Sequence, residues 1–135
     1  MYAGGSKRSG VLTDTTFWID LLEERWHRRV GPATGIIARH RPFELCLSIV
    51  SWGELTEGLF EFQDFDRFLC GVRVLMLPRQ VAWEAGRIQR DLSGRGARLG
   101  ENDSWIAAAA RAWGHRLVSR DEAFGRVPRL QVVRY

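Results

Sequence analysis

Short apolar segments of β-strand type alternate with longer helical segments along the whole chain, and this alternation limits the possible folds more than any other feature. The sequence predicts strands at 11–14, 45–50, 72–77, 116–119 and 130–134. It predicts helices at 17–29, 51–62, 65–69, 80–92 and 103–113. Strands that alternate with helices in this way form a parallel sheet with helices on both faces. We therefore expect an α/β fold with a short parallel sheet.

The chain length and the first residues define the expected domain organisation. The 135 residues suit one compact domain and are too few for two. Segment 1–10 is rich in Gly, Ser, Lys and Arg and has no apolar core, so it is expected to be a flexible leader and not a secretory signal. Residues 11–135 are expected to form the folded domain. No apolar run approaches the ~20 residues of a membrane helix, and we expect a cytoplasmic protein without a membrane anchor.

The cysteine and histidine residues do not predict a zinc site. Cys46 lies in an apolar run and is expected in the core, and neither it nor Cys70 belongs to a CxxC motif. The three histidines, His27, His40 and His115, are far apart and follow no zinc-binding spacing. A disulfide is not favoured in a cytoplasmic protein. The net charge of +4 comes mainly from Arg, which fits a nucleic-acid substrate and equally an ordinary Arg-rich surface.

Four carboxylates follow the predicted strands. Asp14 ends the first strand, and Glu54 lies in the first turn of the helix after the second strand. Asp103 opens the Ala-rich helix, and Asp121 comes two residues after the fourth strand. Ligands of open α/β sheets bind at the carboxyl ends of the strands. We therefore expect these four side chains to line one pocket at that edge.

Each carboxylate also has a purely structural interpretation. A capping box that begins at Ser51 accounts for Glu54. An N-cap role accounts for Asp103, and turns account for Asp14 and Asp121. Two carboxylates ~5 Å apart repel by roughly 3 kcal/mol at an effective dielectric near 20, so a gathered set requires a cation or a proton. A site of oxygen ligands suits Mg²⁺ or Mn²⁺, and such ions support phosphodiester hydrolysis.

Four segments together resemble PIN domains, and their order and spacing are similar to those of the VapC toxins. They are VLTDTTFWIDLL, LSIVSWGELTEGL, ENDSWIAAAARAWGHRLVSRDEAF and VPRLQVVRY. The resemblance extends from about Val11 to the C-terminus. It implies a small three-layer α/β/α fold and a Mg²⁺- or Mn²⁺-dependent endoribonuclease. It also implies that the protein is the toxin of a toxin–antitoxin pair, inhibited by a cognate antitoxin.

The resemblance also implies roles for individual residues. By motif position, the catalytic and metal-binding carboxylates would be Asp14, Glu54, Asp103 and Asp121. Thr15 and Ser119 would orient ligands or water through their hydroxyl groups. The chain departs from the family pattern twice, because Thr16 stands where Asn is usual and Ala123 stands where many members carry a further Asp. Both departures affect the fine geometry of the site and leave the four carboxylates in place.

Aromatic residues suggest a partner surface. Trp18, Trp26 and Trp105 lie on apolar helical faces and are expected in the core. The aromatic residues of segment 52–65 are core candidates too, but some of them could form a groove for an amphipathic antitoxin helix. The resemblance and the aromatic content both predict a homodimer. The basic stretch 25–41 could guide an RNA backbone or form a solvated surface.

Two other function classes compete with the nuclease. The first is a non-catalytic RNA- or partner-binding module on the same fold, in which the acidic cluster holds no metal. The complete set of four carboxylates favours the enzyme. The second is a hydrolase of small phosphates with a D-x-D nucleophile pair, but Thr16 occupies the second Asp position. The glycines of segment 94–100 do not have the spacing of a dinucleotide-binding loop, and no strand precedes them.

Overall fold

The computed structural model describes residues 10–41, 44–58 and 62–135, and its centre is a parallel sheet of five short strands. The strands are β1 (Val11–Thr13), β2 (Leu45–Ser48), β3 (Arg73–Leu75), β4 (Arg116–Val118) and β5 (Val132–Val133). Their spatial order is β3-β2-β1-β4-β5, and every neighbouring pair is parallel. The predicted α/β class with a short parallel sheet is confirmed, although all five strands are shorter than the sequence predicts.

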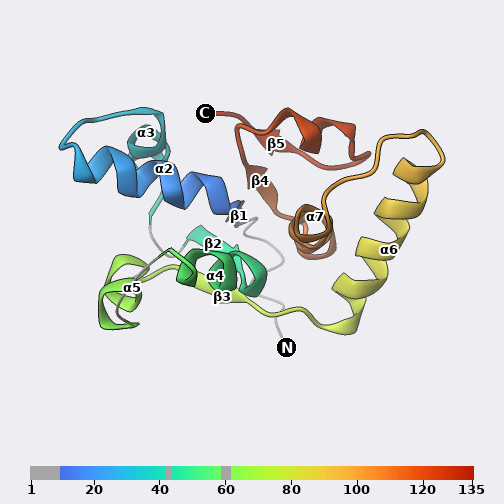
Figure 1. Ribbon diagram of the computed structural model, residues 1–135, viewed down its shortest axis with the longest axis horizontal. Coiled ribbons are helices and arrows are strands. Elements are labelled where there is room, and N and C mark those ends of the chain that lie inside the picture. The colour runs from blue at the N-terminus through green and yellow to red at the C-terminus, as the bar shows by residue number, and fades with distance from the viewer. Residues whose placement is uncertain (1–9, 42–43, 59–61) are drawn as a thin grey trace.

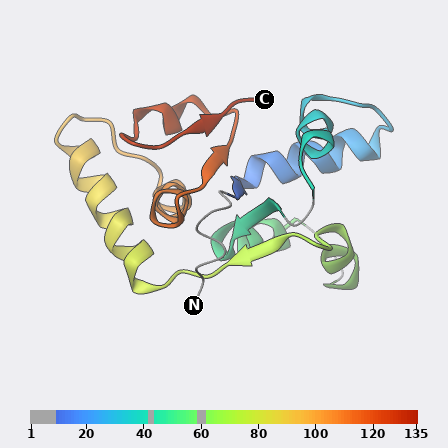
Figure 2. The same ribbon diagram turned by 180° about the vertical axis from the view of Figure 1, so that it is seen from behind.

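Helices cover both faces of the sheet, as expected for a three-layer α/β/α domain. The helices are α2 (Thr15–Trp26), α3 (Pro32–Arg39), α4 (Ile49–Thr56), α5 (Phe62–Phe68), α6 (Arg79–Ser93) and α7 (Glu101–Trp113). A short 3-10 helix, η2 (Glu122–Arg126), precedes β5. Figures 1 and 2 show α2 and α3 on one side of the molecule and α6 and α7 on the other.

Alternating strand residues enter two separate cores. Leu12, Cys46 and Leu117 pack with α6 and α7 on one face. Val11 and Val118 pack with α2 and α3 on the other face. Both core faces require apolar residues at nearly every strand position, because a parallel sheet in an α/β fold is buried on both sides. The sheet is therefore rigid, and its carboxyl edge holds the side chains that follow the strands in fixed positions.

Two features of α7 match the sequence. Residues 107–110, all alanine, are fully buried, so the helix packs closely against its neighbours. Gly114 ends the helix with φ 69°, the left-handed conformation that glycine adopts without strain. Cys46 is buried, as expected, and burial raises the pKa of its thiol to about 11. Cys70 is exposed and both cysteines are free.

Helix α3 is the largest element that the sequence did not predict. Its segment PATGIIAR contains Gly, Thr and two Ile residues, all of which have weak intrinsic helix propensity. The helix is stabilised from outside by Glu24, a buried residue of α2. The Glu24 carboxylate accepts hydrogen bonds from the backbone N–H groups of Gly31, Ala33 and Thr34 at 2.8–3.0 Å and from the Thr34 hydroxyl at 2.6 Å. This cap comes from the preceding helix, 7 to 10 residues earlier in the chain, so the sequence of α3 itself does not show it.

The tryptophans of α2 behave differently from one another. Trp18 is buried, as predicted, and its indole N–H donates to the Thr13 hydroxyl at 2.6 Å. Trp26 was also predicted in the core, but it is 84% exposed, so this prediction is wrong. The helix ends at Trp26, and its last turn buries Glu24 while the Trp26 ring faces solvent. Trp105 is partly buried against the core that includes α6 and α7.

No helix in the part of the chain that the structure describes is both long and apolar enough to cross a membrane. Residues 1–9, most of the predicted leader, lie outside the described residues.

Candidate active site

Asp14 is held at the carboxyl end of β1, where it also caps α2. Its Oδ1 accepts a hydrogen bond from the backbone N–H of Phe17 at 2.9 Å. Its Oδ2 accepts one from the Ser119 hydroxyl, which follows the neighbouring strand β4, at 2.6 Å. The carboxylate is almost completely buried, and this burial raises its pKa to about 6 against the opposing effect of the two hydrogen bonds. The charges of Asp103 and Asp20 raise it further.

Asp103 lies in the first turn of α7 and does not cap that helix. The helix begins two residues earlier than predicted, and its N-cap is Gly100. Burial raises the pKa of Asp103, and the charges of Asp121 and Glu54 raise it further. The charge of Asp103 also raises the pKa of Asp14. All three other predicted carboxylates therefore interact electrostatically with Asp103.

Glu54 lies in the second turn of α4, not in the first. The helix begins at Ile49 and is capped by the Ser48 hydroxyl, so the predicted capping box at Ser51 is wrong. The Glu54 carboxylate instead bridges two other elements. Its Oε1 accepts a hydrogen bond from the Thr15 hydroxyl at 2.5 Å, and its Oε2 accepts one from the Asn102 amide at 3.0 Å.

Asp121 has the local turn role that was one interpretation of its position in the sequence. Its side chain accepts a hydrogen bond from the backbone N–H of Ala123 and caps η2. Its own backbone N–H donates to the Ser119 hydroxyl at 3.0 Å. Ser119 therefore contacts both Asp14 and the Asp121 backbone, and it ties the ends of β1 and β4 together.

The structure thus brings the four predicted carboxylates to one edge of the sheet, together with the hydroxyls of Thr15 and Ser119. A sequence profile described as the PIN domain matches residues 11–130. The chain belongs to the PIN-domain family. No curated protein sequence matches the chain at a significant level.

Solved structures with the same fold are found among bacterial complexes. The chain is similar to a structure of VapBC2 from Rickettsia felis bound to a DNA fragment from its promoter, with a TM-score of 0.77 and 18% identity over 93% of this chain and 98% of that chain. A second is a structure of VapBC-1 from nontypeable Haemophilus influenzae, with a TM-score of 0.73 and 23% identity over 92% of this chain and 96% of that chain. A third is a toxin–antitoxin complex from Klebsiella pneumoniae, with a TM-score of 0.72 and 21% identity over 92% of this chain and 96% of that chain.

The donor chemistry of this PIN domain fits a hard divalent cation. The groups at the sheet edge are carboxylates and hydroxyls, the ligands that Mg²⁺ and Mn²⁺ prefer. The neighbours that shift the pKa of Asp103 are themselves carboxylates, so their mutual repulsion would be relieved by a cation. Within the described ranges, however, no group of three or more His, Cys, Asp or Glu side chains is already arranged to hold a metal ion. The Glu54 carboxylate is hydrogen-bonded to Thr15 and Asn102 instead, and the Asp14 carboxylate is hydrogen-bonded to Ser119.

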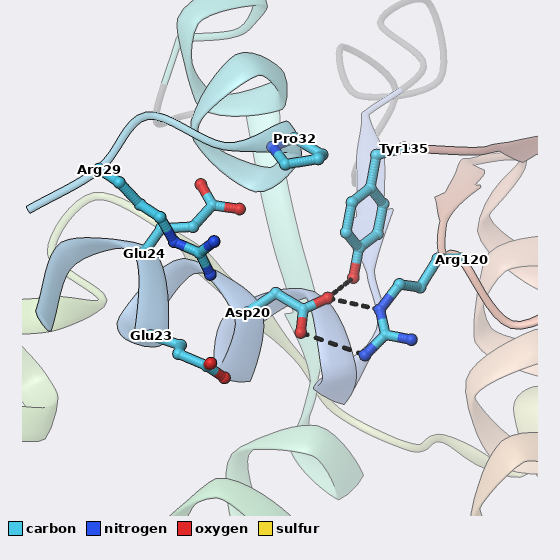
Figure 3. A pocket seen from close by; sticks show the side chains of 7 residues that line it. All are labelled: Asp20, Glu23, Glu24, Arg29, Pro32, Arg120 and Tyr135. Carbon is cyan, nitrogen blue, oxygen red and sulfur yellow. Dashed lines mark hydrogen bonds and ion pairs between the residues drawn. The ribbon is translucent and has the colours of Figure 1, made fainter. Parts of the chain in front are cut away.

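Three residues beside the site were not predicted as a group. Arg120 lies between Ser119 and Asp121, and its guanidinium donates to both oxygens of Asp20, at 2.7 and 3.2 Å. The Tyr135 hydroxyl donates to the same carboxylate at 2.7 Å, and Figure 3 shows the three side chains together. These hydrogen bonds raise the pKa of Arg120, and burial raises the pKa of Tyr135. The place of Arg120 inside the S-R-D motif was the only signal in the sequence.

The PIN domain also carries an apolar groove that ends at the acidic site. Its volume is about 460 Å³, and it is lined from α2 by Ile19, Leu22, Glu23 and Trp26, and from α4 and the turn after it by Glu54, Leu55 and Gly58. Ile19 is 50% exposed, which is unusual for a large apolar side chain. The groove therefore lies between α2 and α4.

The sequence left two possibilities open for the aromatic residues of segment 52–65, the core or a partner groove, and two of them pack in the core. Phe65 is buried, and the Trp52 ring packs against it with a centroid distance of 4.6 Å. Phe60 and the side chain of Phe62 lie outside the described residues. Polar and aromatic residues alternate in this segment, and this pattern does not show that Trp52 of α4 packs against Phe65 of α5.

Proposed function

We propose that this protein is a Mg²⁺- or Mn²⁺-dependent endoribonuclease that hydrolyses RNA phosphodiesters and is the toxin of a type II toxin–antitoxin pair. One observation carries the proposal. At the carboxyl edge of a PIN-domain sheet, Asp103 interacts with three other carboxylates, and its pKa and that of Asp14 are raised. Such an arrangement is unfavourable without a cation, and raised carboxylate pKa values are typical of functional sites.

In the proposed mechanism, Asp14, Asp103 and Glu54 would hold the cation and Asp121 would support it. When bound, a divalent ion lowers the pKa of water and offsets negative charge on the phosphate. Ser119 keeps the Asp14 carboxylate in one orientation through its hydrogen bond. Thr15 and Asn102 do the same for Glu54 from its two sides. These bonds fix the direction of the oxygen ligands before the ion arrives, which reduces the cost of ordering them.

The toxin role rests on the partners of similar proteins and on the apolar groove. The three solved structures described above contain VapBC or toxin–antitoxin pairs. The groove between α2 and α4 fits the apolar face of an amphipathic helix. Because Glu54 lines one end of the groove, a basic side chain of the bound segment would reach the acidic site. An antitoxin bound there would compete with the cation for the carboxylates.

Self-association is part of the proposal. Homodimers are the commonest oligomers, and the two-fold arrangement would place two acidic sites on one particle. Sedimentation of the isolated chain across a wide concentration range tests this point. A single monomeric species at all concentrations would contradict it.

The experiment that tests the nuclease compares cleavage of a single-stranded RNA with and without Mn²⁺. Wild type is expected to cleave with Mn²⁺ and to lose activity in excess EDTA. Asp103→Asn is expected to be inactive, while Asp91→Asn, an exposed change on α6, serves as the control. Mn²⁺ should also raise the melting temperature of wild type and not that of Asp103→Asn, since a ligand that binds the folded state stabilises it. RNA binding without cleavage in any metal would favour the non-catalytic module.

A further inference from the structure

A small pocket lies beside the acidic site and shares one lining residue, Glu23, with the apolar groove. Its volume is about 170 Å³, and it lies between α2, the start of α3, Arg120 and Tyr135. Typical ligand pockets measure about 300–1,000 Å³, so this one fits a single planar group and not a whole cofactor.

One wall of the pocket is held rigidly. Asp20 accepts two hydrogen bonds from Arg120 and one from the Tyr135 hydroxyl. The Tyr135 ring also packs edge-on against Phe17, with a centroid distance of 5.5 Å. Both Phe17 and Asp20 belong to α2, so the aromatic ring is fixed relative to the helix that Asp14 caps.

The opposite wall offers unused hydrogen-bonding groups. The side chains of Arg29 and Glu23 line the pocket, and neither has a hydrogen bond or ion pair with another described residue. Glu24 also lines it, but its oxygens are occupied in capping α3. The pocket therefore presents one guanidinium donor and one carboxylate acceptor that are available to a ligand.

The pocket is close to the acidic site. Arg120 directly follows Ser119, whose hydroxyl contacts Asp14, and directly precedes Asp121. The charge of Asp20 raises the pKa of Asp14, and the charge of Asp14 raises the pKa of Tyr135, so these groups interact electrostatically. A nucleotide beside a phosphate at the acidic site would lie within reach of this pocket.

The charge of the lining excludes a phosphate as the preferred ligand. The pocket is lined by three carboxylates and only two guanidinium groups, so an additional anion would be repelled. A neutral planar group is not repelled. Figure 3 shows the Tyr135 ring at one side of the space, next to Pro32, and a base would stack on this aromatic ring.

We propose that this pocket binds the base of the nucleotide next to the scissile phosphate and that it selects guanine. Guanine presents two adjacent acceptors, O6 and N7, which match an Arg side chain such as Arg29. Its N1–H and N2–H₂ groups are adjacent donors, which match a carboxylate such as Glu23. Adenine and uracil lack both pairs, and cytosine lacks the pair of adjacent donors. This assignment rests on the proposed ribonuclease function, but binding of the base alone is measurable without cleavage.

The test is a titration of the full chain with each of the four nucleoside 5′-monophosphates in EDTA, followed by two-dimensional NMR. Guanosine monophosphate is expected to bind tightest, with a preference of about 5-fold to 150-fold, the discrimination expected from one bidentate contact. Arg29→Met and Glu23→Gln should each remove the preference. Arg39→Met and Asp91→Asn make the same charge changes at exposed positions outside the pocket and should retain it.

Three results would overturn the proposal. They are equal binding of all four nucleotides, a preference that persists in both pocket variants, and displacement of guanosine monophosphate by inorganic phosphate alone. Mapping of cut sites in a mixed-sequence RNA separates this proposal from the nuclease function. A guanine preference in binding without any cleavage would leave the pocket assignment standing and contradict the nuclease. Cleavage with no guanine at the cut sites would support the nuclease function and contradict the pocket assignment.

Discussion

The hydroxyl of Ser119 lies 2.6 Å from Oδ2 of Asp14, although the two residues are 105 positions apart in the chain. Each follows one of two neighbouring parallel strands, β1 and β4. The bond stabilises the charged form of a carboxylate that burial pushes toward the neutral form. Ser119 therefore adjusts the ionisation of Asp14 as well as its orientation.

Removal of this hydroxyl should shift the pH dependence of activity. In Ser119→Ala, the pKa of Asp14 is expected to rise above about 6, because a hydrogen bond that lowers it is lost. RNA cleavage should then fall most at low pH and recover as the pH rises. The cleavage rate measured from pH 5 to pH 9 checks this. Ser93→Ala, a change at the exposed end of α6, is the control. An unchanged pH profile would contradict the role of Ser119.

The metal-free protein should lose stability as the pH rises through the titration range of Asp14. Its pKa is 3.8 in the unfolded chain and about 6 in the folded protein. Below pH 3.8 both states are protonated, and between the two values only the unfolded state loses its proton, so unfolding becomes easier. The resulting decrease in the free energy of unfolding is at most about 3 kcal/mol. Chemical denaturation in EDTA at pH 4 and pH 7 measures it. Asp14→Asn, which keeps an N-cap side chain, should weaken this pH dependence.

Asp103→Asn separates the catalytic interpretation from the structural one. The structure gives the N-cap position of α7 to Gly100, so Asp103 has no capping bond to lose. The change should keep or slightly raise the melting temperature without metal, because it removes repulsion from Asp121 and Glu54. Cleavage with Mn²⁺ should fall by about 100-fold or more, since a ligand of the cation is lost. Wild-type activity in this variant would contradict the proposed site.

The positions of Asp14 and Asp121 at the sheet edge could be predicted because they depend mainly on strand order. In a parallel sheet, the residues after β1 and β4 meet at one edge whatever the intervening sequence is. The partners of the four carboxylates could not be predicted in the same way. The bond from Asn102 to Glu54 depends on where α7 begins, and the sequence placed that start two residues too late.

Contacts between one element and another explain the other differences. The weak helix propensity of α3 is compensated by Glu24, and a carboxylate in α2 gives no sign of the helix that it caps. Periodicity places Trp18 and Trp26 on helical faces that look alike. Only the tertiary structure shows that the core ends before Trp26. Patterns within a segment therefore predicted the elements, while the packing between segments decided burial and caps.

The contact between Gly31 and Glu24 should make a small substitution costly. A Cβ at position 31 would lie 2.5 Å from the Glu24 carboxylate, and the backbone there has φ −124°, which any residue adopts. Gly31→Ala is therefore expected to displace the cap by steric contact and lower the free energy of unfolding by about 1–3 kcal/mol. Gly86→Ala in α6 is the matched control, because nothing lies within 4 Å of its Cβ. The control should stabilise the protein by about 0.5–1 kcal/mol. Equal effects of both changes, measured by denaturation, would contradict the cap.

Trp26 should be needed for inhibition and not for the fold or for catalysis. Its side chain is 84% exposed at the groove between α2 and α4, so Trp26→Ser is expected to change the unfolding free energy by less than about 0.5 kcal/mol. An antitoxin helix in the groove would bury this ring, and large aromatic side chains are frequent hot spots of binding, with losses of about 2 kcal/mol or more. Trp26→Ser should therefore cleave RNA like wild type but require about 30-fold more antitoxin for inhibition. Trp83→Ser is the control, because Trp83 is also exposed but lies on α6, away from the groove. Inhibition curves with the product of the neighbouring gene measure both variants. If Trp83→Ser weakens inhibition and Trp26→Ser does not, the antitoxin binds elsewhere and the groove assignment is wrong.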